Sequence, residues 1–311
     1  MADNTVSLPE WKGLFDWSMT LQDGAHKAEY KSYDPEKMQW LEEVMKNCTL
    51  DIGRRMVEIS KGLIRPEESS EAISEKEELL EELTEICESI DFARDLGKVG
   101  GLPCVIAFLS SNHSSLRWRA AELLAVCAQN NPPVQKEFLD AGVLQSLLPL
   151  LGDPCSTVKA KSLLALSAMV RSFAAGTIVA RREGVPALLC SHLSMADGDA
   201  RVLRKCLQLL HHFCSLRNED TVAVLESGAV RLLPELYKHE DRDVVHWALQ
   251  ITLLVASHDA SRQRLLQEAP NILESLERFE QELGELSTEN ADALSQELDM
   301  ARRLQKVFSS T

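Results

Sequence analysis

Cysteine and histidine side chains that lie close together are the first candidates for chemistry in this sequence, because they bind zinc. The cluster in question consists of Cys206, His211, His212 and Cys214. His211 and Cys214 would share one face of a helix because they are three positions apart. A closed structural zinc site needs about four ligands, so two on one face are insufficient. We interpret the cluster as a structural cysteine beside surface histidines and predict no metal site.

Motifs for nucleotide binding and catalysis are absent from the sequence. The glycine-rich run GKVGG at residues 97–101 has neither the spacing of a phosphate-binding loop nor a preceding strand. The sequence contains no HExxH zinc-protease motif, no GxSxG nucleophile motif and no kinase signature set. Its scattered Asp and Glu pairs are typical of any acidic helical protein. We therefore predict a protein that is not an enzyme, with no catalytic residues and no cofactor.

The elements that would position binding residues are related amphipathic helices that recur along the chain. They are predicted at residues 116–126, 158–169, 202–213 and 243–254. Each is preceded by a glycine and apolar residues, at Gly101, Gly142, Gly184 and Gly228. The glycine spacings are 41 (142 − 101), 42 (184 − 142) and 44 (228 − 184). A helical period of about 40–47 residues is typical of HEAT and armadillo solenoids.

The fold predicted from this repeat is all-α. Leu and Ala are abundant, and alternating β-branched stretches are scarce. Each unit reads as a short helix, a glycine, a second helix, a loop and a long third helix, and the glycine suits a left-handed end of the first helix. We predict a right-handed superhelical solenoid of about four armadillo-like repeats with helical caps at both ends.

The repeats divide the sequence into four predicted segments. Residues 1–34 form a flexible N-terminal segment, either a weakly ordered tail or, through Trp11, Phe15 and Trp17, a short segment that docks on a partner. Residues 35–74 form N-terminal capping helices, which start at the Asp34-Pro35 pair and break near residues 47–50, followed by a polar linker over residues 65–74.

Residues 75–257 contain the armadillo-like repeats, and their first helix, over residues 75–90, corresponds to the third helix of a partial repeat. Residues 92–99 are predicted as the short first helix of the next unit. Residues 258–311 form C-terminal capping helices, with a short helix over residues 259–268 and two longer ones after it. A short coiled coil is the alternative for those two.

Charge and cysteine usage restrict the partners and the compartment. The 33 basic and 48 acidic residues give a net charge of −15, which argues against nucleic acid or an anionic membrane surface as partner. The acidity serves either solubility or the steering of a basic partner surface. Eight cysteines without a CxxC pair, and a start without the apolar run of a signal peptide, favour the cytoplasm. No apolar run reaches the ~18 residues of a membrane helix, and we expect a monomer.

Superposing the third helices indicates which residues line the concave face of the solenoid. One column contains Glu85, Val126, Ala168, His212 and Leu253, and the column one turn earlier contains Glu81, Glu122, Leu164, Gln208 and Leu249. Peptide-binding armadillo proteins resemble one another in carrying Trp in the earlier column and Asn in the later one. This chain has neither ladder, which favours a folded domain as the ligand.

Basic residues at neighbouring positions belong either to a solvated helix face or to the same interface. They are Arg117, Arg119, Lys159, Lys161, Arg204 and Lys205. Mixed charge on a concave surface suits a protein interface, where Arg is enriched. The predicted partner-binding residues are Glu81, Glu85, Arg119, Glu122, Lys161, Gln208 and His212.

Several segments resemble the armadillo-type nucleotide exchange factors of the Hsp70 chaperone, the Hsp70-binding protein family. They are EKMQWLEEVM at residues 36–45, ELLEELTEICESI at 78–90, LRWRAAELLAVCAQN at 116–130, and residues 158–171. The resemblance covers roughly residues 36–308. It implies a curved clamp whose concave face grips the nucleotide-binding domain of Hsp70 and loosens ADP, without a nucleotide site of its own. The alternative function is a general armadillo scaffold or adaptor for other folded proteins.

Overall fold

The computed structural model describes residues 39–40, 52–66, 69–193 and 198–309, and for residues 284–295 it describes the backbone alone. Every regular element in these ranges is a helix, which confirms the all-α prediction. The chain begins with α3 (Ile52–Leu63) and α4 (Ser70–Cys87). The predictions for residues 1–34, for the Asp34-Pro35 helix start and for the break near residues 47–50 lie outside the described residues.

Four three-helix units follow α4, as the repeat predicts. The first contains α5 (Ile90–Asp95), α6 (Gly101–Phe108) and α7 (Ser114–Ala128). The second contains α8 (Pro132–Asp140), α9 (Val143–Leu147) with the 3₁₀ turn η1 (Leu148–Gly152), and α10 (Ser156–Val170). The third contains α11 (Ala174–Arg182), α12 (Val185–Ser191) and α13 (Ala200–Leu216). The fourth contains α14 (Asn218–Glu226), η3 (Ala229–Leu232) with α15 (Leu233–Leu236), and α16 (Arg242–Ala256).

Glycines separate the first two helices of each unit, at positions that correct the predicted repeat by one residue. Gly142, Gly184 and Gly228 have φ between 73° and 75°, in the left-handed region. In the first unit the left-handed residue is Gly100, with φ 75°, whereas Gly101 is the first residue of α6. The spacings are therefore 42 (142 − 100), 42 (184 − 142) and 44 (228 − 184). A left-handed residue carries a steric cost unless it is glycine.

The predicted polar linker over residues 65–74 is wrong in its second half, because α4 begins at Ser70. The side chain of Ser69 accepts a hydrogen bond from the backbone N–H of Ala72 over 3.2 Å, which caps the helix. A serine at this position replaces one of the hydrogen bonds that a helix start lacks. The run of Ser and Glu residues is thus a capped first turn. The short helix predicted over residues 92–99 also begins earlier, as α5 at Ile90.

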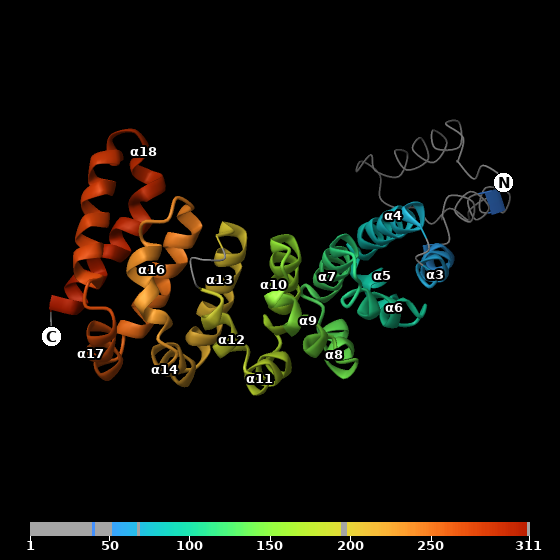
Figure 1. Cartoon of the computed structure of the whole chain (residues 1–311), viewed down its shortest axis with the longest axis horizontal. Coiled ribbons are helices and arrows are strands. Elements are labelled where there is room, and N and C mark those ends of the chain that lie inside the picture. Colours follow the sequence, from blue (N-terminus) through green and yellow to red (C-terminus); the bar gives the residue numbers. More distant parts are fainter. Residues whose placement is uncertain (1–38, 41–51, 67–68, 194–197, 310–311) are drawn as a thin grey trace, which may run out of the picture.

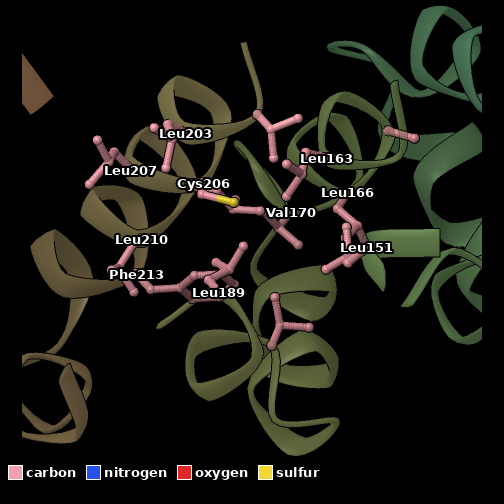
Figure 2. Packing of buried hydrophobic residues seen from close by; sticks show 14 of the residues in the cluster. Leu151, Leu163, Leu166, Val170, Leu189, Leu203, Cys206, Leu207, Leu210 and Phe213 are labelled. Atoms are coloured by element: carbon pink, nitrogen blue, oxygen red, sulfur yellow. The ribbon is translucent and has the colours of Figure 1, made fainter. Parts of the chain in front are cut away.

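The hydrophobic core is a continuous layer between the helices of adjacent units. Figure 2 shows how it is built where α10, α12 and α13 meet. Val170 from α10 lies beside Cys206 from α13, and Leu189 from α12 lies beside Phe213 from α13, and all four are at most 1% exposed. Each unit therefore buries its apolar face against its neighbour, as a solenoid requires.

Ion pairs and hydrogen bonds between units reinforce the apolar layer. Arg117 of α7 binds Asp153, which precedes α10, and Arg181 of α11 binds Asp220 of α14; in both, arginine Nε lies 2.7 Å from a carboxylate oxygen. The partners of these two ion pairs are 36 and 39 residues apart, which is about one repeat, so the pairs fix one unit on the next. Within the second unit, Gln135 of α8 donates from Nε2 to the carbonyl oxygen of Ala168 of α10 over 2.6 Å.

The C-terminal cap contains α17 (Asp259–Glu268), as predicted, and α18 (Ile272–Ser309). The two longer helices of the prediction are the two arms of this one element. Arg302 Nε lies 2.7 Å from Glu280 Oε1, although 22 residues of straight helix would span about 33 Å. The element therefore folds back on itself, as Figure 1 shows at the C-terminal end. Phe279 and Leu304 are buried, so this cap covers the last repeat.

The units form a curved row in which the third helices share one side. In Figure 1, α4, α7, α10, α13 and α16 lie side by side along the concave edge, and α8, α11, α14 and α17 lie along the convex edge. This arrangement confirms the predicted solenoid, and it places any residue on the open face of a third helix in one continuous surface.

Candidate functional site

The concave face is the candidate functional site, and the third helices bring most of the predicted residues onto it. The predicted site residues on these helices are Glu81 and Glu85 on α4, Arg119 and Glu122 on α7, Lys161 on α10, and Gln208 and His212 on α13. All of them are partly or fully exposed. Leu249, which the superposition placed in the same columns, is 0% exposed and packs in the core. The superposition is therefore shifted by one residue in α16, where the partly exposed Gln250 takes the predicted position of Leu249.

The N-terminal part of the concave face is a small acidic hollow between α4 and α7. Its volume is about 190 Å³, and it is lined by Glu81, Thr84, Glu85, Trp118, Arg119 and Glu122. The Arg119 guanidinium lies 4.2 Å from the centre of the Trp118 ring. Arg119 is also 3.7 Å from the Glu77 carboxylate, so a stacked ring and an ion pair hold this cation in place.

Two of the predicted site residues bind each other across the boundary between α7 and α10. Lys161 donates a hydrogen bond to the Glu122 carboxylate, and both side chains are 30% exposed. The Lys161 ammonium lies 6.0 Å from the Trp118 ring. The two charges thus partly neutralise each other, and the ion pair holds both side chains in place on the surface.

Farther along the concave face, two adjoining hollows occupy the surface between α10 and α13. One has a volume of about 410 Å³ and the other about 400 Å³, and Leu164, Lys205 and Gln208 line both. Cations outnumber anions among the charged groups that line them: Lys161, Arg201, Arg204 and Lys205 line the first beside Asp243, and Arg171 and Lys205 line the second among neutral polar residues. The middle of the concave face is therefore basic, although the protein as a whole carries a net charge of −15.

Burial and neighbouring charge act together on Lys205. Burial lowers the pKa of its ammonium group, and the positive charges of Arg204 and Arg171 lower this pKa further. Arg204 itself is paired, because it lies 2.9 Å from an Asp243 carboxylate oxygen. Lys205 is thus a partly desolvated cation among other cations.

Sequence reasoning did not include Arg171 and Arg201 among the basic residues of this face. Arg171 follows α10 at the position that Gln129 occupies after α7, 42 residues earlier (171 − 129), and both residues line the same hollow. The repeat spacing was the signal that could have identified Arg171. Arg201 lies at the start of α13 and pairs with Asp199 over 2.8 Å.

Two histidines of α13, His211 and His212, lie next to the basic region. Burial lowers the pKa of both His211 and His212, and the charge of Arg171 lowers it further, so both rings favour the neutral form. The His211 ring lies 5.2 Å from the Trp247 ring. His212 is half-buried, and its Nε2 atom has no hydrogen-bond partner among the described residues. In the described ranges no group of three His, Cys, Asp or Glu residues is arranged to hold a metal ion.

Arg117 is not part of the site, contrary to its grouping with the other basic residues. Its side chain is 13% exposed and forms two hydrogen bonds with Asp153, of 2.7 and 2.9 Å. A third hydrogen bond of 2.9 Å reaches the carbonyl oxygen of Ser111. Arg117 therefore connects two repeats, whereas Arg119, two residues later, faces the groove.

Left-handed residues follow α7 and α10 and line the second hollow. Asn130 has φ 53° and Ser172 has φ 56°, and they occupy equivalent positions 42 residues apart (172 − 130). Asn130 lies just beyond the end of α7, and asparagine tolerates this conformation. None of the helices in the described residues is long and apolar enough to cross a membrane.

Family comparisons match two adjoining parts of the chain. A model described as "Nucleotide exchange factor Fes1" matches residues 11–96, and a model described as "SIL1/FES1/HPBP1 C-terminal domain" matches residues 92–218. The matched parts include all of α4, α7, α10 and α13, which line the concave face.

Individual relatives match shorter parts. The human "Hsp70-binding protein 1" is 33% identical over 180 residues, which cover 54% of this chain and 50% of that protein. "Nucleotide exchange factor SIL1" of Xenopus laevis is 36% identical over 117 residues, covering 37% of this chain and 26% of that protein. "Hsp70 nucleotide exchange factor FES1" of Coccidioides immitis is 33% identical over 89 residues, covering 28% and 42%. The chain spans about half the length of the Hsp70-binding protein 1 relatives.

Among solved structures, a designed armadillo repeat protein superposes with a TM-score of 0.63 and 16% identity, covering 81% of this chain and 99% of that one. Another set of armadillo repeat proteins, computationally designed for modular peptide recognition, gives a TM-score of 0.66 at 18% identity, covering 81% and 99%. These likenesses show the armadillo fold. The two family models together match residues 11–218, which places this part of the chain in the SIL1/FES1/HPBP1 family.

Proposed function

We propose that this protein is a co-chaperone that binds the nucleotide-binding domain of Hsp70 through its concave face and promotes the release of ADP. The observation that carries the proposal is the row of polar hollows along α4, α7, α10 and α13 in a chain of this family. The relatives that it matches are named as Hsp70-binding proteins and nucleotide exchange factors.

The mechanism needs no covalent chemistry from this chain. A partner shifts a conformational equilibrium only by its difference in affinity for the two states. Accelerating ADP release by about 10³-fold requires ~4 kcal/mol of preference for the open nucleotide-binding domain. An interface above about 1,200 Å² can supply that preference. The protein therefore acts as a rigid clamp and not as an enzyme, and it needs neither a metal nor a cofactor of its own.

The contacts proposed for this role are the groove residues of the third helices. They are Glu81, Glu85, Arg119, Glu122, Lys161, Gln208 and His212. Both signs of charge are present on a surface with shallow hollows. Such a surface suits the face of a folded domain better than an extended peptide, which needs a regular ladder of side chains.

We further propose that the protein works in the cytoplasm as a monomer. Its cysteines Cys87, Cys127, Cys190 and Cys214 are buried free thiols. Burial raises the pKa of the Cys190 thiol and raises that of Cys214 to about 12, which keeps both in the unreactive protonated form. Such thiols suit a reducing compartment.

The release of a fluorescent ADP analogue from Hsp70 tests the proposed function. Stopped-flow traces with and without this protein should show a release rate that rises with its concentration and then saturates. Binding to Hsp70 without any acceleration at saturation would overturn the exchange activity. That result would favour the alternative, a general armadillo scaffold for folded proteins.

The Lys161–Glu122 pair offers a test of the concave face itself. Glu122→Lys breaks the pair, whereas Glu122→Lys combined with Lys161→Glu restores it with the charges exchanged. If the groove contacts Hsp70, the double variant should bind more weakly than the wild type while its helical circular dichroism is unchanged. Binding at the wild-type affinity would remove this pair from the interface.

A further inference from the structure

Arg171 and Lys205 are two cations without a counter-ion on the concave face. Neither side chain forms an ion pair or hydrogen bond within the described part of the chain. Most neighbouring cations are paired: Lys161 with Glu122, Arg201 with Asp199, and Arg204 with Asp241 and Asp243. Because acidic residues outnumber basic ones by 15 (48 − 33), unpaired cations here are not a consequence of composition.

The positions of the two cations make them accessible to a partner. Both line the 400 Å³ hollow, and Lys205 also lines the adjoining 410 Å³ hollow. Arg171 is exposed and Lys205 is partly buried. Gln208, Ser167 and Gln129 line the same hollow and add neutral hydrogen-bonding groups around the cations.

Lys205 would gain stability from an incoming anion. Burial and the charges of Arg204, Arg171 and Lys161 all disfavour its charged form, and Asp243 is the group that favours it. A carboxylate placed between Arg171 and Lys205 would relieve this repulsion. It would also give the partly desolvated ammonium group of Lys205 a charge-assisted hydrogen bond.

We propose that Arg171 and Lys205 form the docking point for a cluster of carboxylates on the surface of the partner protein. This inference rests on the proposed function and adds the chemistry of one contact. The N-terminal end of the concave face instead carries Glu81 and Glu85. A partner with an acidic patch at one end and a basic patch at the other would therefore bind in one orientation, because the reverse places like charges together.

The acidic groups around the hollows favour separate carboxylates over a dense polyanion. Glu122, Asp199 and Asp243 lie beside the cations and pair with Lys161, Arg201 and Arg204. A nucleic acid or a chain of phosphates would extend over these carboxylates and be repelled, whereas single side-chain carboxylates reach Arg171 and Lys205 without crossing them.

The test compares two pairs of substitutions with the same change in charge. The first is Arg171→Met with Lys205→Met, which removes the unpaired cations and keeps long side chains. The matched control is Lys136→Met with Arg182→Met on α8 and α11, where the two side chains are 72% and 74% exposed. Binding of each full-length variant to the nucleotide-binding domain of Hsp70 is measured by calorimetry at several salt concentrations.

We expect the groove variant to bind at least about tenfold more weakly than the control and to lose part of the salt dependence. The control should stay within about twofold of the wild type. Lys205→Arg should retain most of the affinity, because it keeps the charge, and equal thermal midpoints would show that all variants fold. Equal affinities of the groove and control variants would overturn this inference and leave the proposed function intact. Absence of wild-type binding would overturn both.

Discussion

At the scale of single residues, cations of one chemical type have different roles in this protein. Arg117 and Arg181 are mostly buried and bind carboxylates of the next repeat. Arg171 and Lys205 have no such partner in the part of the chain that the structure describes, and they line the open groove. The difference comes from the distance to a carboxylate one repeat away and not from the residue type.

The buried pair of Arg117 and Asp153 should contribute strongly to stability. Arg117→Met leaves Asp153, whose side chain is 6% exposed, without its cation. We expect a loss of about 3–5 kcal/mol in the free energy of unfolding, the usual cost of removing one partner of a buried pair. Urea unfolding followed by circular dichroism measures this loss.

The control for that measurement is Lys98→Met, which breaks the exposed pair with Asp95, whose side chains are 72% and 37% exposed. This substitution should cost about 0–1 kcal/mol. Equal effects of the two substitutions would mean that the Arg117 pair is hydrated and contributes little.

Residue roles were the least predictable feature of the sequence. Arg117 and Arg119 are two positions apart in one helix and looked equivalent. Arg117 contacts Asp153, 36 residues away in the loop before α10, and only the packing of the units brings the two together. The unpaired state of Lys205 is likewise a property of the assembled groove.

At the scale of elements, the left-handed glycines set the direction in which each second helix leaves the first. Gly142 has φ 75°, and a Cβ atom there would meet nothing closer than 3.9 Å. The cost of Gly142→Ala is therefore backbone strain alone, which we expect to be about 1–2 kcal/mol. Thermal unfolding followed by circular dichroism measures it.

Gly152→Ala is the matched control, because φ at Gly152 is not positive and the space around its Cβ position is open. This substitution should be neutral or stabilise the protein by a few tenths of a kcal/mol. Destabilisation by Gly152→Ala as large as that by Gly142→Ala would contradict the role assigned to the left-handed conformation.

Periodicity predicted the helices, but it did not fix which residue of each helix occupies a given position of the repeat. The sequence places two glycines at residues 100–101, and composition does not distinguish which one is left-handed. In α16, Leu249 and Leu253 are four positions apart on one side of the helix, and both are apolar, so no polar residue set the register of the superposition there. The capped start of α4 was missed because its capping residue, Ser69, lies inside the polar run and is followed by Ser70 and Glu71.

At the scale of the whole molecule, the solenoid should respond locally to damage. Leu249→Ala removes a fully buried side chain from α16, and we expect a loss of about 2–5 kcal/mol in that region. Hydrogen exchange should accelerate in α16 and its neighbours while α4 and α7 keep their protection, since each repeat packs on its neighbours alone.

Gln250→Ala, on the same helix, should leave the exchange pattern nearly unchanged, because the side chain of Gln250 is partly exposed. Loss of protection along the whole chain in the Leu249 variant would indicate one cooperative unit. That outcome would show that the interfaces between repeats are stronger than the repeats themselves.

The overall architecture was predictable because the same two features, a glycine and a long third helix, recur in every unit. The distribution of charge over the concave face was not. It depends on which cations find partners across a repeat boundary, as Lys161 does with Glu122 and Arg204 with Asp243. A periodic pattern gives the scaffold, whereas the surface follows from differences between repeats.

The ion pairs that cross the repeat boundaries have a consequence for how such a protein can change in evolution. Lys161 reaches back to Glu122 in the unit before it, whereas Arg204 reaches forward to Asp243 in the unit after it. Deleting or duplicating one unit would bring unmatched side chains into contact, even though the backbone would join smoothly. The number of repeats is therefore expected to resist recombination, and new specificity should arise by substitution within existing units.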